Sequence, residues 1–295
     1  MQTIVNNLRN LKRIIAFIAG LVAIIASITT QAQDKSLLWR VSGNNLTKPS
    51  FLFGTIHLIC PDDYIWTDKM KASLEQSEKV CFEMDLSDPG IMMRAMAGMM
   101  DSSGKRLEEY FTTDQYKLLA RYIKDSLNLD LALFEKMKPV MLETFISSGN
   151  INCPDPVSYE ERIMKTAQAE GKKIMGLEDA KDQIADLEQI PTATVIKNLM
   201  EDIQNSGKAD TDYAQLVAAY RAQDLPALYN LIMNSPDLED EKGPLLDDRN
   251  KKWVVQMANE MERNSIFFAV GAGHLYGPVG VIALLRKKGY TVKPL

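Results

Sequence analysis

Two short segments near opposite ends of the chain share one pattern, and this pattern constrains the fold more than any other feature. Each is an apolar run that leads into Gly-x-x-His-Leu-x-x-Pro: FLFGTIHLICP contains His57 and FAVGAGHLYGP contains His274. These are the only two histidines among 295 residues, so a chance coincidence of context is improbable. Such apolar runs predict buried strands, and glycine lets the chain turn off each strand. We therefore expect residues 54–57 and 271–274 to lie side by side in one sheet.

Further strand-like and helix-like segments place these two elements in an α/β fold. Strands are predicted at 36–42, 50–55, 80–86, 173–178, 265–270 and 290–295. Helical patterns lie between them, which is typical of βα units and a mostly parallel sheet. No Pro/Gly/Ser-rich linker divides the chain. We predict a mixed α/β single domain at 34–295, with a central, largely parallel sheet built from both chain ends and a large helical insertion at about 91–171.

The first 33 residues have the pattern of a secretory signal peptide. Arg9, Lys12 and Arg13 precede an apolar run at 14–28, small and polar residues follow, and no acidic residue is present. The run is shorter than the roughly 20 residues that a membrane span needs. We expect cleavage after residue 32 or 33, which predicts a secreted or periplasmic protein without membrane attachment. The alternative is an uncleaved N-terminal anchor.

Charge and cysteine content narrow the classes of partner. With 34 basic and 39 acidic residues, a net charge of −5 and an isoelectric point near 5.3, the chain is not expected to bind nucleic acid. A peptide or a small molecule is the expected substrate. In an oxidising compartment Cys60, Cys81 and Cys153 allow one disulfide, but their spacing does not identify the partners. Cys81 lies in an apolar run and is equally explained as a buried thiol.

Acidic residues end two of the predicted strands. Glu83 and Asp85 lie at the end of one, and Glu178 ends another. Because the carboxyl ends of parallel strands form the binding crevice of such a sheet, His57, Glu83, Glu178 and His274 are expected to converge there. Two imidazoles with carboxylates are typical of hydrolase sites for Zn, Mn, Fe or Co, and the same groups can also activate water without a metal. Asp85 is equally explained as a strand-end cap.

Arg249 is a further candidate, in the DDRNKKW segment of a predicted helix at 245–261. Its guanidinium can hold a substrate carboxylate or stabilise developing negative charge. From the residues alone, an Asp–Arg pair on a solvent-exposed helix face is the simpler explanation of this segment.

Taken together, these segments resemble the TraB/GumN family. The resemblance is carried by FLFGTIHL, VCFEMD, GLED followed by Gln183, DDRN, and VGAGHLYGPVGVIALLRKKGY, and it extends over about residues 37–294. That family is related to the Tiki proteases and more distantly resembles erythromycin-esterase-like and ChaN-like proteins. The resemblance implies an α/β core with a helical insert and a site of His57, Glu83 and His274, with Arg249 and Glu178 at further family positions. The family usually has GLET where this chain has GLED, which leaves Glu178 in place.

The resemblance also implies a function. Tiki members use a divalent metal for peptide hydrolysis, which favours an exported metal-dependent hydrolase that acts on peptide bonds. In this hypothesis His57, Glu83 and His274 hold the metal (Mn, Co, Zn or Fe) and its water, and Arg249 orients the substrate. One alternative is a metal-free ester or amide hydrolase. Another is a haem- or ligand-binding envelope protein without catalysis, which the ChaN-like resemblance and the helically spaced methionines at 92–100 suggest, although such methionines more often line a core or a groove.

Overall fold

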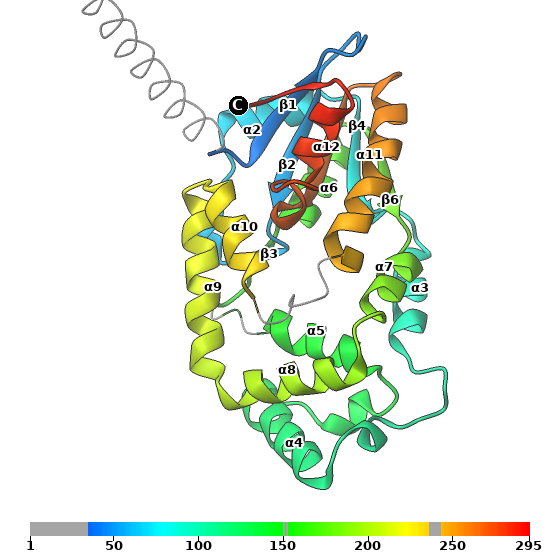
Figure 1. The fold of residues 1–295 in the computed structure, drawn as a ribbon, viewed down its shortest axis with the longest axis vertical. Helices are drawn as coiled ribbons and strands as arrows, with labels where there is room; N and C mark the ends of the chain where they lie inside the picture. Colours follow the sequence, from blue (N-terminus) through cyan, green and yellow to red (C-terminus); the bar gives the residue numbers. More distant parts are fainter. Residues whose placement is uncertain (1–34, 150, 152, 236–242) are drawn as a thin grey trace, which may run out of the picture.

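A computed structural model describes residues 35–149, 151, 153–235 and 243–295. Its centre is a six-stranded sheet in the order β6-β4-β7-β2-β1-β8 (Figure 1). The strands are β1 (Leu38–Ser42), β2 (Ser50–Thr55), β4 (Lys79–Met84), β6 (Lys173–Glu178), β7 (Ile266–Gly271) and β8 (Thr291–Pro294). The predicted signal peptide at 1–33 lies outside the described residues. Within the described ranges, no helix is both long and apolar enough to span a membrane.

The sheet is largely parallel, as the strand pattern predicts. The strands β6, β4, β7 and β2 run in the same direction, whereas β1 is antiparallel to both of its neighbours, β2 and β8. All six residues of β2 are buried, and so are five of the six in β7. This burial explains their continuous apolar runs, because central parallel strands are covered on both faces. The described residues therefore form a mixed α/β fold with a sheet built from both ends of the chain.

The two Gly-x-x-His elements lie side by side, which confirms the prediction made from their shared pattern. The strands that lead into them, β2 and β7, are direct neighbours in the sheet. Gly54 lies opposite Val270, and Thr55 lies opposite Gly271.

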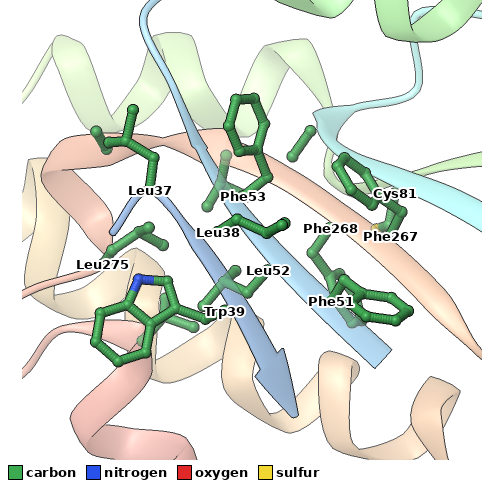
Figure 2. Packing of buried hydrophobic residues seen from close by; sticks show 14 of the residues in the cluster. Leu37, Leu38, Trp39, Phe51, Leu52, Phe53, Cys81, Phe267, Phe268 and Leu275 are labelled. Carbon is green, nitrogen blue, oxygen red and sulfur yellow. The ribbon is translucent and has the colours of Figure 1, made fainter. Parts of the chain in front are cut away.

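Helices cover both faces of this sheet, and Figure 2 shows the apolar side chains between the layers. The helices α11 (Asp248–Met261) and α12 (Val281–Lys287) pack on one face, and α6 (Tyr159–Ala169) packs on the other. A further helix, α2 (Asp68–Gln76), packs against β2 and is capped by Thr67, whose hydroxyl accepts from the Met70 nitrogen. The core contains Trp39, Phe53, Phe82, Phe267 and Phe268, all of them almost fully buried.

A glycine brings the ends of β4 and β6 close together. A Cβ added to Gly176 would lie 2.3 Å from the backbone nitrogen of Asp85 and 2.7 Å from the carbonyl carbon of Met84. Any larger residue would therefore push the two strands apart at this point. Glu83 and Glu178 each lie two residues from this contact, Glu83 before Asp85 and Glu178 after Gly176. The close approach therefore keeps both carboxylates within reach of one partner side chain.

Most of the remaining helices form a second, mostly helical region, in the lower part of Figure 1. The helices at 206–221 and 225–233 also pack against the main core, to which they contribute Val217, Tyr220, Leu225 and Leu228. The remaining helices fall in two stretches, one within residues 91–171 and one at 180–233, and between the two stretches α6 and β6 belong to the sheet layer. A small separate core joins the helices at 113–127, 139–149 and 192–204, with Leu119, Ile123, Leu142 and Leu199 buried. The remaining helices are α3 (Ile91–Met99), α4 (Thr113–Leu127), α5 (Pro139–Gly149), α7 (Ala180–Leu187), α8 (Thr192–Gln204), α9 (Ser206–Arg221) and α10 (Leu225–Met233).

Some local expectations differ from the structure. The glycines at 277 and 280 do not belong to α12, which begins only at Val281, because Gly277 has φ +94° and a turn joins the Gly280 nitrogen to the Gly277 carbonyl. Met92, Met93, Met96 and Met100 are exposed by 41–76%, which excludes core packing for these four and leaves the alternative that they line a groove. Of the three cysteines, Cys81 is a buried free thiol.

Candidate functional site

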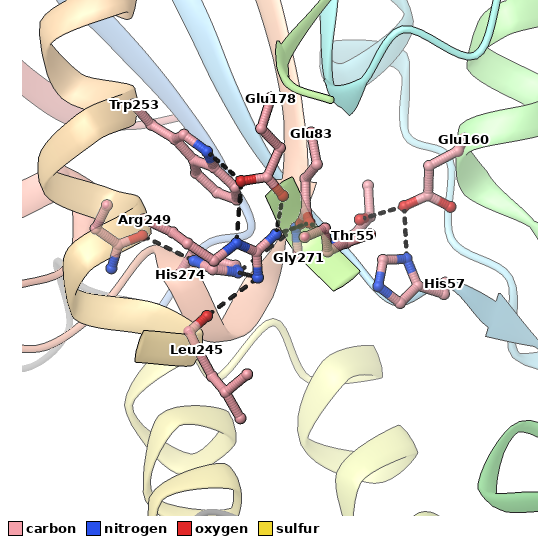
Figure 3. A network of polar contacts seen from close by, with 12 residues as sticks. Thr55, His57, Glu83, Glu160, Glu178, Leu245, Arg249, Trp253, Gly271 and His274 are labelled. Carbon is pink, nitrogen blue, oxygen red and sulfur yellow. Dashed lines mark hydrogen bonds and ion pairs between the residues drawn. The ribbon is translucent and has the colours of Figure 1, made fainter. Parts of the chain in front are cut away.

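The predicted site residues gather where the parallel strands end. Glu83 is the next-to-last residue of β4, Glu178 ends β6, and Arg249 lies in the first turn of α11. His274 is the last residue of the short 3-10 helix η6 (Ala272–His274), which directly follows β7. His57 lies just after β2. The structure brings four of the five into one contact network and places His57 in an adjoining pocket (Figure 3).

Arg249 is the centre of this network. Its Nη2 donates to Glu83 Oε2 at 2.8 Å and to Glu178 Oε1 at 2.6 Å, and its Nε donates to Glu178 Oε2 at 3.2 Å. Its Nη1 donates to the carbonyl of Leu245 at 3.0 Å and lies 3.3 Å from His274 Nε2. The side chains of Arg249, Glu83 and Glu178 are at most 10% exposed. The interpretation of Arg249 as part of a solvent-exposed pair is therefore wrong, because its planar fork binds two buried carboxylates.

His274 is held in one orientation by the residue that follows Arg249. The Nδ2 of Asn250 donates to the carbonyl of Val279 at 3.0 Å, which directs its Oδ1 toward His274. That Oδ1 lies 2.8 Å from His274 Nδ1, so His274 carries its proton on Nδ1 and its Nε2 accepts from Arg249. The indole of Trp253 packs on the imidazole at 4.4 Å between ring centroids.

Burial and charge fix the protonation states of this network. Burial lowers the pKa of His274 to about 3, so its imidazole is neutral near pH 7. Burial by itself raises the pKa of Glu83, but the positive charges of Arg249 and His57 oppose it, and the pKa is lowered to about 2. The backbone N–H of Gly271, 2.8 Å from Glu83 Oε1, favours the same ionised form. For Glu178 burial has the larger effect and raises the pKa.

His57 has a different environment, although its sequence motif is the same. Its side chain is 73% exposed, and its Nδ1 lies 3.2 Å from Glu160 Oε1. The hydrogen bond with Glu160 raises the pKa of His57 to about 9, against the opposing effect of desolvation. His57 thus stands exposed at the site, whereas His274 is only 5% exposed.

A pocket of about 320 Å³ joins the two parts of the site. Its polar side chains are those of His57, Glu83, Ser158, Glu160 and Gln183. Gln183 also donates to Glu83 Oε2 at 3.4 Å. Apolar side chains complete the wall: Leu58, Phe82, Met84, Leu86 and Ala269. The pocket therefore combines an apolar lining with an ionised carboxylate and a protonated imidazole, an arrangement that suits a substrate with a polar reacting bond.

The predicted metal ligands are of suitable chemical type, but they are not arranged around one point. Among the described side chains, no group of three or more His, Cys, Asp or Glu is placed to hold a metal ion. The guanidinium of Arg249 already contacts both Glu83 and His274, and those two side chains stand 4.0 Å apart between Oε1 and Nε2. His57 points its Nδ1 at Glu160 instead. The three residues His57, Glu83 and His274 as placed here do not fit a metal ion.

Asp85 has a structural role in the loop after β4. Its Oδ1 accepts hydrogen bonds from the backbone nitrogen and the hydroxyl of Ser87, at 3.0 Å and 2.6 Å. This is the turn-capping explanation that the sequence left open for Asp85.

Sequence reasoning missed Glu160 entirely. It is the second residue of α6, where an acid in the first helical turn is ordinarily explained by the helix dipole. Trp253 was also missed; its Nε1 donates to Glu178 Oε2 at 3.0 Å. Its spacing of four residues from Arg249 was the available signal, because residues four apart share one face of a helix.

The fold and this strand-end cluster define an α/β protein with a site of acidic, imidazole and guanidinium groups. Residues 37–294 match the model of the TraB/PrgY/gumN family, and the chain belongs to that family.

Curated relatives share the name of one kind of enzyme. The chain is 24% identical to Metalloprotease TIKI2 of Danio rerio, in a match that covers 90% of this chain and 62% of that protein. It is 23% identical to a Metalloprotease TIKI homolog of Amphimedon queenslandica, covering 90% and 63%. It is also 23% identical to human Metalloprotease TIKI1, covering 89% and 62%. The chain thus spans less than two thirds of the length of these relatives. No solved structure matches the chain.

Proposed function

We propose that this protein is a hydrolase that cleaves a peptide bond, or an acyl bond of a small molecule, in the pocket of His57 and Glu83. The observation that carries the proposal is the opposite protonation of these two pocket groups. The pKa of His57 is raised to about 9 and that of Glu83 is lowered to about 2, so one is an acid and the other a carboxylate at neutral pH. Two titratable groups with pKa values driven apart are a frequent basis of acid–base catalysis.

The chain's own groups suffice for a hydrolytic step. The Nδ1 of His57 faces Glu160, so its Nε2–H is the group that can donate to the leaving group or to a developing oxyanion. Glu83 lines the same pocket and can accept a proton from water. Arg249 and Gly271 hold the Glu83 carboxylate, and His274 and Asn250 support Arg249 and keep that part of the site rigid.

A metal-dependent form of the reaction is supported by the relatives, which are named metalloproteases. In that form His57, Glu83 and His274 would be the residues that hold a divalent ion (Mn, Co, Zn or Fe), and the ion would supply Lewis acidity for activating water. The side chains as described do not fit this form, because Arg249 contacts both Glu83 and His274.

A hydrolysis assay separates these forms. The purified protein is incubated with a peptide library and a panel of esters, with and without EDTA, beside the variants His57→Gln and Glu83→Gln. Glu161→Gln is the matched control, because Glu161 is a solvent-exposed neighbour of Glu160 that pairs with Lys165. Loss of hydrolysis in both site variants but not in the control supports the proposal, and full activity of His57→Gln contradicts it.

The chelator arm identifies the form of the reaction. Activity that survives EDTA supports acid–base catalysis by the chain's own groups, and activity lost with EDTA and restored by one ion supports the metal form. Absence of hydrolysis, together with haem absorbance that depends on His57 or His274, supports a ligand-binding envelope protein instead.

We also propose that the protein is exported, on the basis of the signal-like pattern at 1–33. N-terminal sequencing of protein recovered from outside the cytoplasm is expected to begin near residue 33 or 34. Recovered protein that still begins at Met1 contradicts cleavage.

A further inference from the structure

We propose that Glu160 is the positioning residue for His57, and that the disulfide between Cys60 and Cys153 keeps the two together, so that reduction of this disulfide switches the site to a less active state. The inference rests on the proposed function, in which His57 is a reacting group.

The first step of the argument is that Glu160 is fixed whereas His57 is not. Glu160 Oε1 accepts from Thr55 Oγ1 at 2.7 Å, and its Oε2 accepts from Ser158 Oγ at 3.2 Å. The carboxylate side chain is 14% exposed, against 73% for His57. Among the described contacts, Glu160 provides the one side-chain hydrogen bond of His57. The carboxylate therefore determines the orientation of the imidazole and directs Nε2 away from itself.

The second step concerns the ribbon that joins the two residues. The strands β3 (Leu58–Ile59) and β5 (Val157–Ser158) form a separate antiparallel pair of only two residues each. The pair begins one residue after His57 and ends two residues before Glu160. So short a ribbon is only marginally stable by itself. Tyr213 adds one contact, from its hydroxyl to the carbonyl of Leu58 at 3.2 Å.

The third step is the disulfide that flanks this ribbon. Cys60 directly follows β3, and it is bonded to Cys153, four residues before β5, with Cα atoms 5.8 Å apart. The bond links residues 93 apart in sequence. It lowers the conformational entropy of the unfolded chain, so less entropy is lost when the two strands of the ribbon pair. Cys60 is also only three residues from His57, which makes the bond local to the pocket.

The switch is a two-electron reduction. A dithiol reductant transfers two electrons and two protons, the S–S bond breaks, Cys60 and Cys153 become thiols, and the reductant becomes a disulfide. The ribbon then depends on its two residue pairs, the buried side chain of Ile59, and the contacts of Tyr213 with Leu58 and of Thr55 with Glu160. The loop that carries His57 is expected to leave Glu160 for part of the time.

Nuclear magnetic resonance tests the positioning without any substrate. The protein has two histidines, so ring-¹⁵N labelling yields two imidazole systems, and His57→Gln assigns them. We expect a Nδ1–H signal of His57 that is protected from exchange in the oxidised wild type. It should be lost in Glu160→Leu and kept in Glu161→Leu, the matched control on the same helix turn. Persistence of the signal in Glu160→Leu overturns the role of Glu160.

The disulfide is tested by two routes to the same state. The double variant Cys60→Ser/Cys153→Ser and the wild type after dithiol treatment should both lose the protected signal. Near-UV circular dichroism checks that both retain packed tertiary structure. A protected His57 signal in both samples overturns the role of the disulfide.

Kinetics provide the functional readout. The reduced protein, the double serine variant and Glu160→Leu are each expected to lose about tenfold or more in kcat with a much smaller change in KM, since orientation of an acid–base group acts on the chemical step. Glu160→Asp should recover part of the loss. A change confined to KM contradicts a positioning role. If no substrate is hydrolysed, the proposed function fails, and the NMR result alone then decides whether Glu160 positions His57.

Discussion

Thr55 lies directly opposite Gly271 in the parallel pairing of β2 with β7. The two Gly-x-x-His elements are therefore neighbours but one residue out of step, because Gly54 faces Val270 rather than Gly271. A shift of one residue along a strand changes the side of the sheet that a side chain faces. Beyond the paired residues the two elements also differ, because the chain turns into η6 after β7 but continues toward β3 after β2. His57 stands exposed beside Glu160, whereas His274 is buried beside Asn250.

The two histidines should affect stability in opposite pH ranges. The folded pKa of His57 is raised from 6.5 to about 9, so its contribution to the free energy of unfolding is complete below pH 6.5 and is lost as pH rises through 9. The folded pKa of His274 is lowered from 6.5 to about 3 by burial. The unfolded state therefore binds the extra proton below pH 6.5, and stability falls as pH decreases toward 3.

Urea unfolding between pH 4 and pH 9 measures this effect. The stability advantage of the wild type over His57→Gln is expected to shrink as pH rises from 6.5 to 9 and to stay constant below 6.5. An advantage that does not vary with pH would show that the folded protein leaves the pKa of His57 unchanged.

Replacement of Arg249 should be strongly destabilising. Arg249→Leu leaves Glu83 and Glu178 as buried carboxylates without their common partner, which typically costs about 3–5 kcal/mol. Arg249→Lys keeps the charge but not the fork and should lie between the leucine variant and the wild type. Chemical denaturation measures the free energy of unfolding of the wild type and of both variants.

The matched control is Arg221→Leu. Arg221 pairs with Asp63 at 2.7 Å, but its side chain is 57% exposed, and such surface pairs contribute about 0–1 kcal/mol. Equal costs for the two leucine variants would contradict the central role assigned to Arg249.

Asn250→Ala should destabilise the protein through His274. The substitution removes the acceptor of the His274 Nδ1–H and the donor to Val279, and an unsatisfied buried polar group costs about 1–3 kcal/mol. Thermal or urea unfolding measures the cost. Asn264→Ala removes a long hydrogen bond of 3.5 Å to the Glu260 carbonyl and should change stability by less than about 0.5 kcal/mol. A smaller effect at Asn250 than at Asn264 would rule out this account of His274.

Gly176→Ala should separate the ends of β4 and β6. The new Cβ would lie 2.3 Å from the backbone nitrogen of Asp85, and overpacking of this kind costs about 1–3 kcal/mol or more. The backbone cannot yield as a flexible side chain does, so Glu83 and Glu178 should also lose their shared contact with Arg249. Gly243→Ala, where nothing lies within 4 Å of an added Cβ, is the control in the same unfolding experiment. Similar stability of the two variants would contradict the close approach.

The sequence by itself determined the strands, the adjacency of the two Gly-x-x-His elements and the acidic strand ends that meet there. These features follow from local rules, because apolar periodicity and the glycine turns act over a few residues and the carboxyl ends of parallel strands share one edge. Only the tertiary structure decided which histidine is buried, that Glu160 holds His57, that Cys60 pairs with Cys153, and that Arg249 binds both strand-end glutamates. The physical reason is that these outcomes depend on the course of the chain after β2 and β7 and on side chains more than 70 residues apart, whose meeting no local pattern encodes.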